Sequence, residues 1–171
     1  MSSAGATNVG TGEGIGFNVN VGWNKKNLGD NEYVAVWEKL LKPMAQEFNP
    51  DLILVSAGFD AAEGDMGEML VTPECFGRLT RALMTLANCK VVCTLEGGYV
   101  RSRLGKCVAS VIESLLDKNS KQIAQLESEM YDMDQGALSS IDNSAMQSIT
   151  ATLQAHEQYW DCFLSEKPNS T

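Results

Sequence analysis

Two residues of this sequence, Asp60 and Tyr99, stand where side chains could carry out chemistry. Asp60 follows a run of apolar or small residues (52–56) and Gly58, and Tyr99 follows a second apolar run (90–95) and two glycines. An ionised carboxylate can bind a cation or orient a base, and a protonated tyrosine hydroxyl can donate a hydrogen bond to an oxyanion. Together they favour metal-assisted attack on a carbonyl group. The alternative for Asp60 is that it only caps a turn.

The elements that must position these two residues follow from apolar patterning. Residues 52–56 predict a strand buried on both faces, and residues 90–95 predict a second one. Helices are expected over 30–48, over 72–86 (with Thr72 as N-cap and a proline after it) and over 101–116. Strands that alternate with helices predict a parallel α/β sheet with flanking helices. Both strands would then end at one edge, where open α/β sheets bind ligands.

The remaining segments are less informative. Residues 17–23 alternate like a strand, and they follow a glycine-rich stretch, 10–16. A phosphate-binding loop follows a strand instead of preceding one, so we expect close backbone packing there and no nucleotide site. Residues 61–71 predict a loop, 117–149 have weak periodicity, and 144–164 predict an amphipathic closing helix.

Composition limits the function classes. The chain has 171 residues, which suits one domain, and its net charge of −9 argues against direct binding to nucleic acid and suits a basic, Lys-rich partner. No apolar run approaches the length of a membrane span, and residues 1–10 do not resemble a signal peptide. We expect a protein of the nucleus or cytoplasm.

The possible metal-ligating side chains are few. The five cysteines are an odd number without a C-x-x-C pair, so we interpret them as reduced, small core residues. The sequence has a single histidine, His156, which lies on the apolar stripe of the closing helix. We expect it to pack there and not to bind a metal.

Three segments, read in order, are specific to a known family. NVGTGEGIGFNVNVGW, VSAGFDAAEGD and TLEGGYV closely resemble the C-terminal part of the catalytic domain of zinc-dependent class II histone deacetylases, and the later HEQYW is similar to the helix that closes those domains. The resemblance covers residues 8–165, with a lead-in (1–9) and a frayed tail (166–171). It implies part of an arginase-deacetylase fold, and the removal of acetyl groups from lysine side chains of histones or other proteins.

The resemblance also implies site residues. Asp60 matches a zinc ligand of the family, and Tyr99 matches the tyrosine that donates a hydrogen bond to the zinc-bound carbonyl and its tetrahedral intermediate. Gly97 and Gly98 would line the acyl-lysine channel.

The sequence departs from the family in its histidines. The family's Asp-x-His zinc ligands and His-His base pair are absent from these 171 residues. Catalytic zinc sites use about three protein ligands, so we expect this chain neither to bind zinc tightly nor to be active alone. The alternative function is a non-catalytic truncated isoform that acts as an interaction module and associates through exposed sheet edges.

Overall fold

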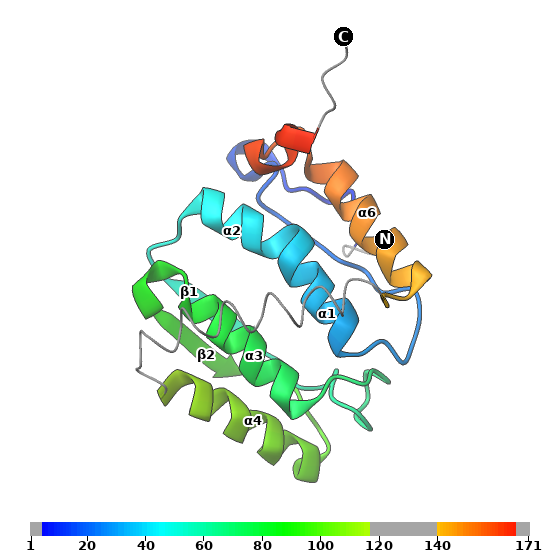
Figure 1. The fold of residues 1–171 in the computed structure, drawn as a ribbon, viewed down its shortest axis with the longest axis vertical. Coiled ribbons are helices and arrows are strands. Elements are labelled where there is room, and N and C mark those ends of the chain that lie inside the picture. The colour runs from blue at the N-terminus through cyan, green and yellow to red at the C-terminus, as the bar shows by residue number, and fades with distance from the viewer. Residues whose placement is uncertain (1–4, 117–139, 167–171) are drawn as a thin grey trace.

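The computed structural model describes residues 5–116 and 140–166, with the backbone alone for residues 165 and 166 (Figure 1). The regular elements in chain order are α1 (Asp30–Val36), α2 (Lys42–Phe48), β1 (Ile53–Ala57), α3 (Pro73–Met84), β2 (Val91–Leu95), α4 (Arg101–Leu116) and α6 (Asn143–His156). A π-helical turn, Trp37–Leu41, joins α1 to α2, and short 3₁₀ turns occur at Gly12–Gly14, Ala87–Cys89 and Asp161–Glu166.

The predicted parallel sheet is confirmed. β1 and β2 pair in parallel, from Ile53 opposite Val91 to Ala57 opposite Leu95. α3 connects them, and α3 and α4 lie side by side over one face of the sheet (Figure 1). Phe59, which follows β1, and Cys107 and Val111 of α4 are buried in the core between the sheet and these helices.

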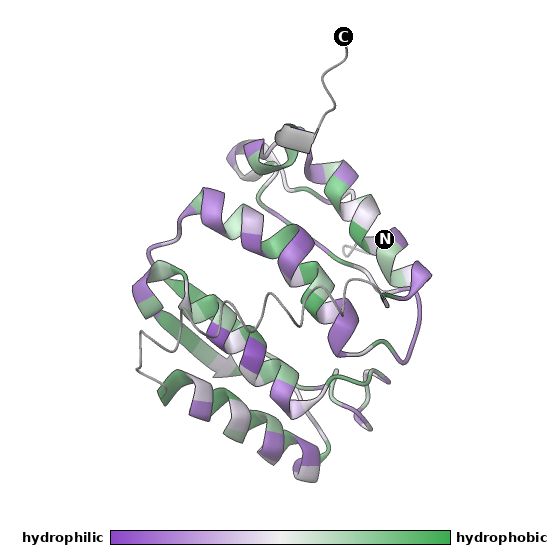
Figure 2. Ribbon diagram, in the orientation of Figure 1, coloured by the Kyte–Doolittle hydropathy of each residue, from purple (hydrophilic) through white to green (hydrophobic). Residues whose placement is uncertain are grey.

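The expectation that the first strand is buried on both faces is wrong for this structure. Both strands are mostly hydrophobic (Figure 2), but on the face opposite α3 and α4 Leu54 is 73% exposed and its neighbour Val92 is 51% exposed. A continuous apolar run indicates that both faces suit burial, but the described residues provide a covering layer for one face only.

The predicted helix 30–48 is one continuous helical segment with a widened middle. The π-helical turn directly precedes α2, which has Pro43 in its first turn. Proline has no N–H and its ring crowds the carbonyl of the residue four positions earlier, so widening of the preceding turn relieves the conflict. The N-cap is Gly29, whose N–H donates to Glu32 at 2.8 Å.

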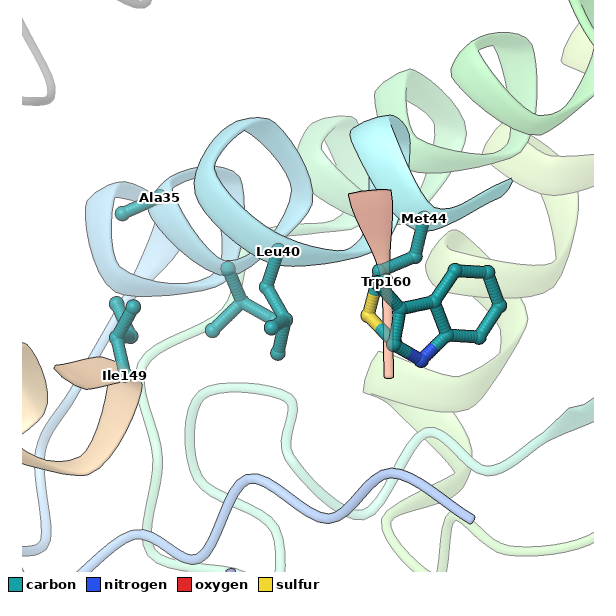
Figure 3. Packing of buried hydrophobic residues seen from close by; sticks show 6 residues of the cluster. Ala35, Leu40, Met44, Ile149 and Trp160 are labelled. Carbon is teal, nitrogen blue, oxygen red and sulfur yellow. The ribbon is translucent and has the colours of Figure 1, made fainter. Parts of the chain in front are cut away.

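A second core cluster joins this helical segment to the end of the chain. Ala35, Leu40 and Met44 pack against Ile149 of α6 and against Trp160 (Figure 3). Trp160 Nε1 also donates to the carbonyl of Gly16 at 2.9 Å. The predicted closing helix therefore forms, although α6 ends at His156 and a 3₁₀ turn follows over Asp161–Glu166.

The strand-like run 17–23 does not form a strand. It crosses the cluster in extended or irregular backbone, tied to α6 because Thr152 Oγ1 donates to the carbonyl of Asn20 at 2.8 Å. A cavity of about 450 Å³ is lined by Val19 and Val21 of this run and by Val55 of β1. A strand needs a neighbouring strand for its backbone hydrogen bonds, and this run has none among the described residues.

The expected close packing of the glycine-rich stretch is found at Gly10 and Gly16 but not at Gly12 and Gly14, where an added Cβ atom would meet nothing within 4 Å. A Cβ atom on Gly16 would lie 2.7 Å from Cβ of Tyr159, so no larger residue fits there. The predictions for the frayed tail 167–171, for most of 117–149 and for the start of the lead-in lie outside the described residues. Within those described, no helix is long and apolar enough to cross a membrane.

Candidate functional site

The loops that follow the two strands are joined to each other. The N–H of Phe59 donates to the carbonyl of Gly97 at 3.1 Å, and the N–H of Glu96 donates to the carbonyl of Ala57 at 3.1 Å. The parallel pairing therefore continues past the strand ends. The segment that bears Asp60 and the segment that bears Tyr99 meet at one sheet edge, as the sequence predicted.

The Asp60 carboxylate lies against two glycines. A Cβ atom on Gly58 would stand 2.9 Å from Asp60 Oδ1, and one on Gly97 would stand 3.2 Å from the same oxygen. The Asp60 side chain is exposed, while its carbonyl accepts a hydrogen bond from Gly67 N at 2.8 Å. An exposed carboxylate on a fixed backbone can accept a cation or a hydrogen-bond donor.

Tyr99 projects from the second loop and is 65% exposed. Gly98 before it has φ +114°, and a Cβ atom there would stand 2.9 Å from Leu104 Cδ1 and 3.0 Å from Phe59 Cβ. A residue other than glycine would be strained at this φ and would also clash. The loop thus turns over Phe59 and presents the Tyr99 hydroxyl to solvent.

Asp65 contacts the Tyr99 segment, which the sequence reasoning did not foresee. Its carboxylate is buried, with 6% of the residue exposed, and Oδ2 accepts from Tyr99 N at 2.9 Å and from Val100 N at 2.8 Å. Oδ1 accepts from Met66 N at 2.7 Å. The hydrogen bonds from Val100, Met66 and Tyr99 hold the pKa of Asp65 below its usual value. The available signal was an acid five residues after Asp60 in the run GFDAAEGD.

Tyr33 of α1 is a second residue near the site that patterning assigned to packing alone. Its ring lies 5.7 Å from that of Trp23, centroid to centroid. Burial raises the pKa of Tyr33, a hydrogen bond with Trp23 lowers it, and the negative charge of Asp60 adds to the rise. Asp60 is thus close enough to influence the hydroxyl of Tyr33, which stays protonated at neutral pH.

His156 packs in α6, as predicted. It is fully buried, with Nδ1 2.9 Å from the carbonyl oxygen of Thr152 and Nε2 3.0 Å from that of Asn18. Both ring nitrogens are therefore engaged by the backbone, away from the sheet edge. Across residues 5–116 and 140–164, no three His, Cys, Asp or Glu side chains stand close enough to hold a metal ion. These residues alone do not fit a zinc site, which takes about three protein ligands.

The cysteines follow the expectation of core residues in part. Cys75 and Cys107 are buried, Cys93 and Cys162 are half-buried, and Cys89 is exposed, contrary to that expectation; all five are free. Burial raises the pKa of Cys75, Cys93 and Cys107, and it raises that of Cys162 to about 11. These four side chains remain thiols at neutral pH and are poor nucleophiles.

Comparison with known proteins agrees with this geometry. Residues 2–115 match the histone deacetylase domain family. The chain is 39% identical over 158 residues to the polyamine deacetylase HDAC10 of Danio rerio (92% of this chain, 22% of that protein). It is 36% identical over 163 residues to the histone deacetylase HDA1 of Saccharomyces cerevisiae (95% and 22%). The chain therefore spans about a fifth of the length of these curated relatives.

A solved structure gives the same result for the fold. The structure of the histone deacetylase Clr3 superposes with a TM-score of 0.80 at 32% identity, over 94% of this chain and 25% of that one. This likeness confirms the expected arginase-deacetylase fold, with its parallel sheet and flanking helices. From the family match and the shared fold, the chain belongs to the histone deacetylase domain family.

Proposed function

We propose that this chain supplies Asp60 and Tyr99 to a class II lysine deacetylase, which hydrolyses the acetyl amide of N6-acetyl-lysine in histones or other proteins. The observation that carries the proposal is the joining of the two strand-end loops by the hydrogen bond from Phe59 N to the Gly97 carbonyl. It brings an exposed carboxylate and an exposed phenol to one sheet edge, where α/β proteins bind ligands.

Each residue has a distinct proposed role. The Tyr99 hydroxyl donates a hydrogen bond to the substrate carbonyl, on whose oxygen negative charge develops. Gly97 and Gly98 form the wall beside the acyl chain, since neither has a side chain to block it. Asp60 would be one ligand of the zinc on which the family depends, and zinc would supply the activation of water.

We propose that the 171 residues alone do not hydrolyse acetyl-lysine. With one histidine in the sequence, which is buried in α6, the chain has no imidazole base at the sheet edge. Asp60 is a single ligand, and we expect zinc to bind weakly to it. The other zinc ligands and the base would come from residues outside this chain.

The substrate class follows from the relatives and from charge. The relatives carry the names histone deacetylase and polyamine deacetylase, and both names denote removal of acetyl groups from amines. A net charge of −9 favours a cationic substrate over an anionic one. We propose acetyl-lysine proteins of the nucleus or cytoplasm, and no nucleic acid or membrane as a direct partner.

A chimera tests this function. Residues 5–166 would replace the matching segment of the Saccharomyces cerevisiae histone deacetylase HDA1, and acetate release would be followed with an acetyl-lysine histone peptide and with N-acetylspermidine. We expect chelator-sensitive hydrolysis of the peptide. A folded chimera without peptide hydrolysis would overturn the proposal, and exclusive hydrolysis of N-acetylspermidine would overturn the lysine assignment.

Matched variants show whether the named residues carry the reaction. Tyr99→Phe should lower kcat about 100- to 1,000-fold, the cost of one oxyanion donor, while Tyr159→Phe removes a hydroxyl elsewhere and should be silent. Asp60→Asn should abolish turnover, while Asp51→Asn, at the other end of β1, should not.

The 171-residue chain assayed with zinc should release no acetate. Release that a chelator stops would contradict our proposal of inactivity.

The uncovered sheet supports a second candidate, a non-catalytic interaction module. Leu54 and Val92 expose an apolar surface on paired strands, and parallel sheets in proteins are covered on both faces. The cavity lined by Val19, Val21 and Val55 is a second apolar hollow, on the side of β1 that faces α3. In this reading the chain binds another polypeptide through the sheet and its edges.

A further inference from the structure

We propose that Asp65 is a positioning residue for Tyr99: its carboxylate fixes the backbone from which the Tyr99 phenol projects, and so determines where the hydroxyl meets the substrate carbonyl. This inference rests on the proposed role of Tyr99. It concerns a different residue, because Asp65 contacts the Tyr99 backbone and has no proposed contact with substrate.

The Asp65 carboxylate anchors the backbone through hydrogen bonds to both of its oxygens. One carboxylate oxygen of Asp65 accepts from two successive backbone N–H groups, at 2.9 Å from Tyr99 and 2.8 Å from Val100. The other oxygen accepts from Met66 N, which fixes the rotation of the carboxylate. Burial of Asp65 keeps water from competing for these donors. Hydrogen bonds of N–H groups to a carboxylate are among the stronger ones in proteins.

Tyr99 depends on this anchor because its ring is mostly in solvent. Packing does not hold the ring, so the backbone has to fix the position and direction of the Cα–Cβ bond from which the phenol projects. On one side of Tyr99 stands Gly98, with its positive φ. On the other side α4 begins, where Arg103 N and Leu104 N both donate to the Val100 carbonyl at 2.9 Å. Asp65 joins this junction to the loop that carries Asp60.

That loop is itself well tied. Ala62 N donates to the Phe59 carbonyl at 3.0 Å, and Asp65 N donates to the Ala62 carbonyl at 3.0 Å. Asp65, five residues after Asp60, is therefore held at a fixed position relative to it. Asp65 therefore couples the position of Asp60 to that of Tyr99. This connection adds to the hydrogen bond from Phe59 N to the Gly97 carbonyl.

A purely structural explanation also exists for Asp65. A carboxylate near the first turn of α4 interacts favourably with the positive end of the helix dipole and satisfies N–H groups there. Such a cap would stabilise α4 without any effect on catalysis through Tyr99. Both explanations predict that Asp65 stabilises the folded chain. Only the positioning role predicts that loss of Asp65 lowers turnover by displacing the Tyr99 hydroxyl.

Amide hydrogen exchange tests the anchor in the full 171-residue chain. We expect the Tyr99 and Val100 amides to be protected in the unsubstituted protein. In Asp65→Asn they should exchange about tenfold faster or more, since the amide group can no longer accept from both donors at full charge. Glu68→Gln removes an exposed carboxylate from the same loop, one that pairs with Lys26 and not with α4, and should leave both amides unchanged. Unprotected Tyr99 and Val100 amides in the unsubstituted chain would overturn the anchor.

A double-mutant cycle in the HDA1 chimera tests positioning. Asp65→Asn should lower kcat about 10- to 100-fold, as expected when a catalytic group is misplaced, with KM nearly unchanged. In a Tyr99→Phe background the same substitution should have almost no further effect, because the hydroxyl it positions is already gone. Equal effects of Asp65→Asn in both backgrounds would overturn positioning and leave only the helix cap.

The two proposals fail in distinguishable ways. A folded chimera that hydrolyses nothing would overturn the proposed function, while hydrogen exchange would still decide whether Asp65 anchors the Tyr99 segment. Additive kinetic effects would overturn positioning while the function stood. If Asp65→Asn does not fold, Asp65→Glu, which keeps the charge and shifts the carboxylate, takes its place in the cycle.

Discussion

The Asp60 carboxylate lies against the backbone of Gly97, so that a Cβ atom on Gly97 would stand 3.2 Å from Asp60 Oδ1. An aspartate that follows β1 and a glycine that follows β2 thus share one contact surface. A side chain added at position 97 would therefore press on the Asp60 carboxylate and not on backbone atoms.

Gly97→Ala should therefore separate activity from stability. The added methyl must displace the Asp60 carboxylate by a few tenths of an ångström, and this exposed side chain can move without disturbing the core. We expect a thermal midpoint close to that of the parent and a clear fall in kcat of the HDA1 chimera. A variant with full activity would show that the contact does not constrain Asp60.

Gly98→Ala should instead lose stability. Its φ of +114° is costly for alanine, and the new Cβ would clash with Leu104 and Phe59. We expect a loss of about 1–3 kcal/mol in the free energy of unfolding, measured by urea denaturation. The matched control is Gly105→Ala in α4, where a Cβ atom would have no neighbour within 4 Å. It should stabilise the helix by about 0.5–1 kcal/mol.

The strands and helices around this site could be predicted from sequence because each has a strong local signal. β2 is a short continuous apolar run, α4 is a long amphipathic one, and α3 begins with Thr72 Oγ1 accepting from Cys75 N at 3.2 Å. The meeting of Asp60 with the second loop follows from parallel pairing alone.

The features that sequence could not predict depend on partners distant in the chain. Asp65 is one acid among 22 Asp and Glu residues, and nothing periodic marks an acceptor for the backbone of residues 34 and 35 positions later. The exposure of Leu54 depends on whether another part of the chain covers its face of the sheet. The hydropathy of the strand does not show whether such a layer exists. The same reason explains why the 17–23 run does not become a strand.

Asp65 should also make stability depend on pH in the acidic range. Hydrogen bonds from Val100, Met66 and Tyr99 lower the pKa of Asp65 in the folded state below its usual value. Its contribution is therefore complete above the unfolded pKa and is lost as pH falls through the lower, folded pKa. Urea unfolding from pH 6 down to about pH 3 should show a flatter pH dependence for Asp65→Asn than for the parent. Parallel curves for the two proteins would contradict the lowered pKa.

His156 should be structural and not catalytic. Its removal in His156→Ala leaves a void and takes the ring-nitrogen contact away from the carbonyl oxygen of Asn18, while the Thr152 carbonyl keeps its place in the hydrogen bonding of α6. We expect a loss of about 2–4 kcal/mol in the free energy of unfolding. Glu157→Ala, at the exposed neighbouring position, should change it by less than about 0.5 kcal/mol. A stable His156→Ala protein would show that the two contacts contribute little.

Leu54 distinguishes an interaction module from a soluble, independent domain. Its side chain is 73% exposed on a sheet face with Val92 beside it, so it contributes little to the core of this chain and much to an apolar surface. Leu54→Lys should change the free energy of unfolding by less than about 0.5 kcal/mol and should reduce concentration-dependent self-association in sedimentation velocity. Leu40→Ala, at a fully buried position, should do the reverse, with a loss of about 2–5 kcal/mol and unchanged association of the folded fraction. A parent chain that sediments as a monomer at every concentration would show that the sheet face does not bind a second copy. A destabilised Leu54→Lys variant would show that the face is covered within the chain itself.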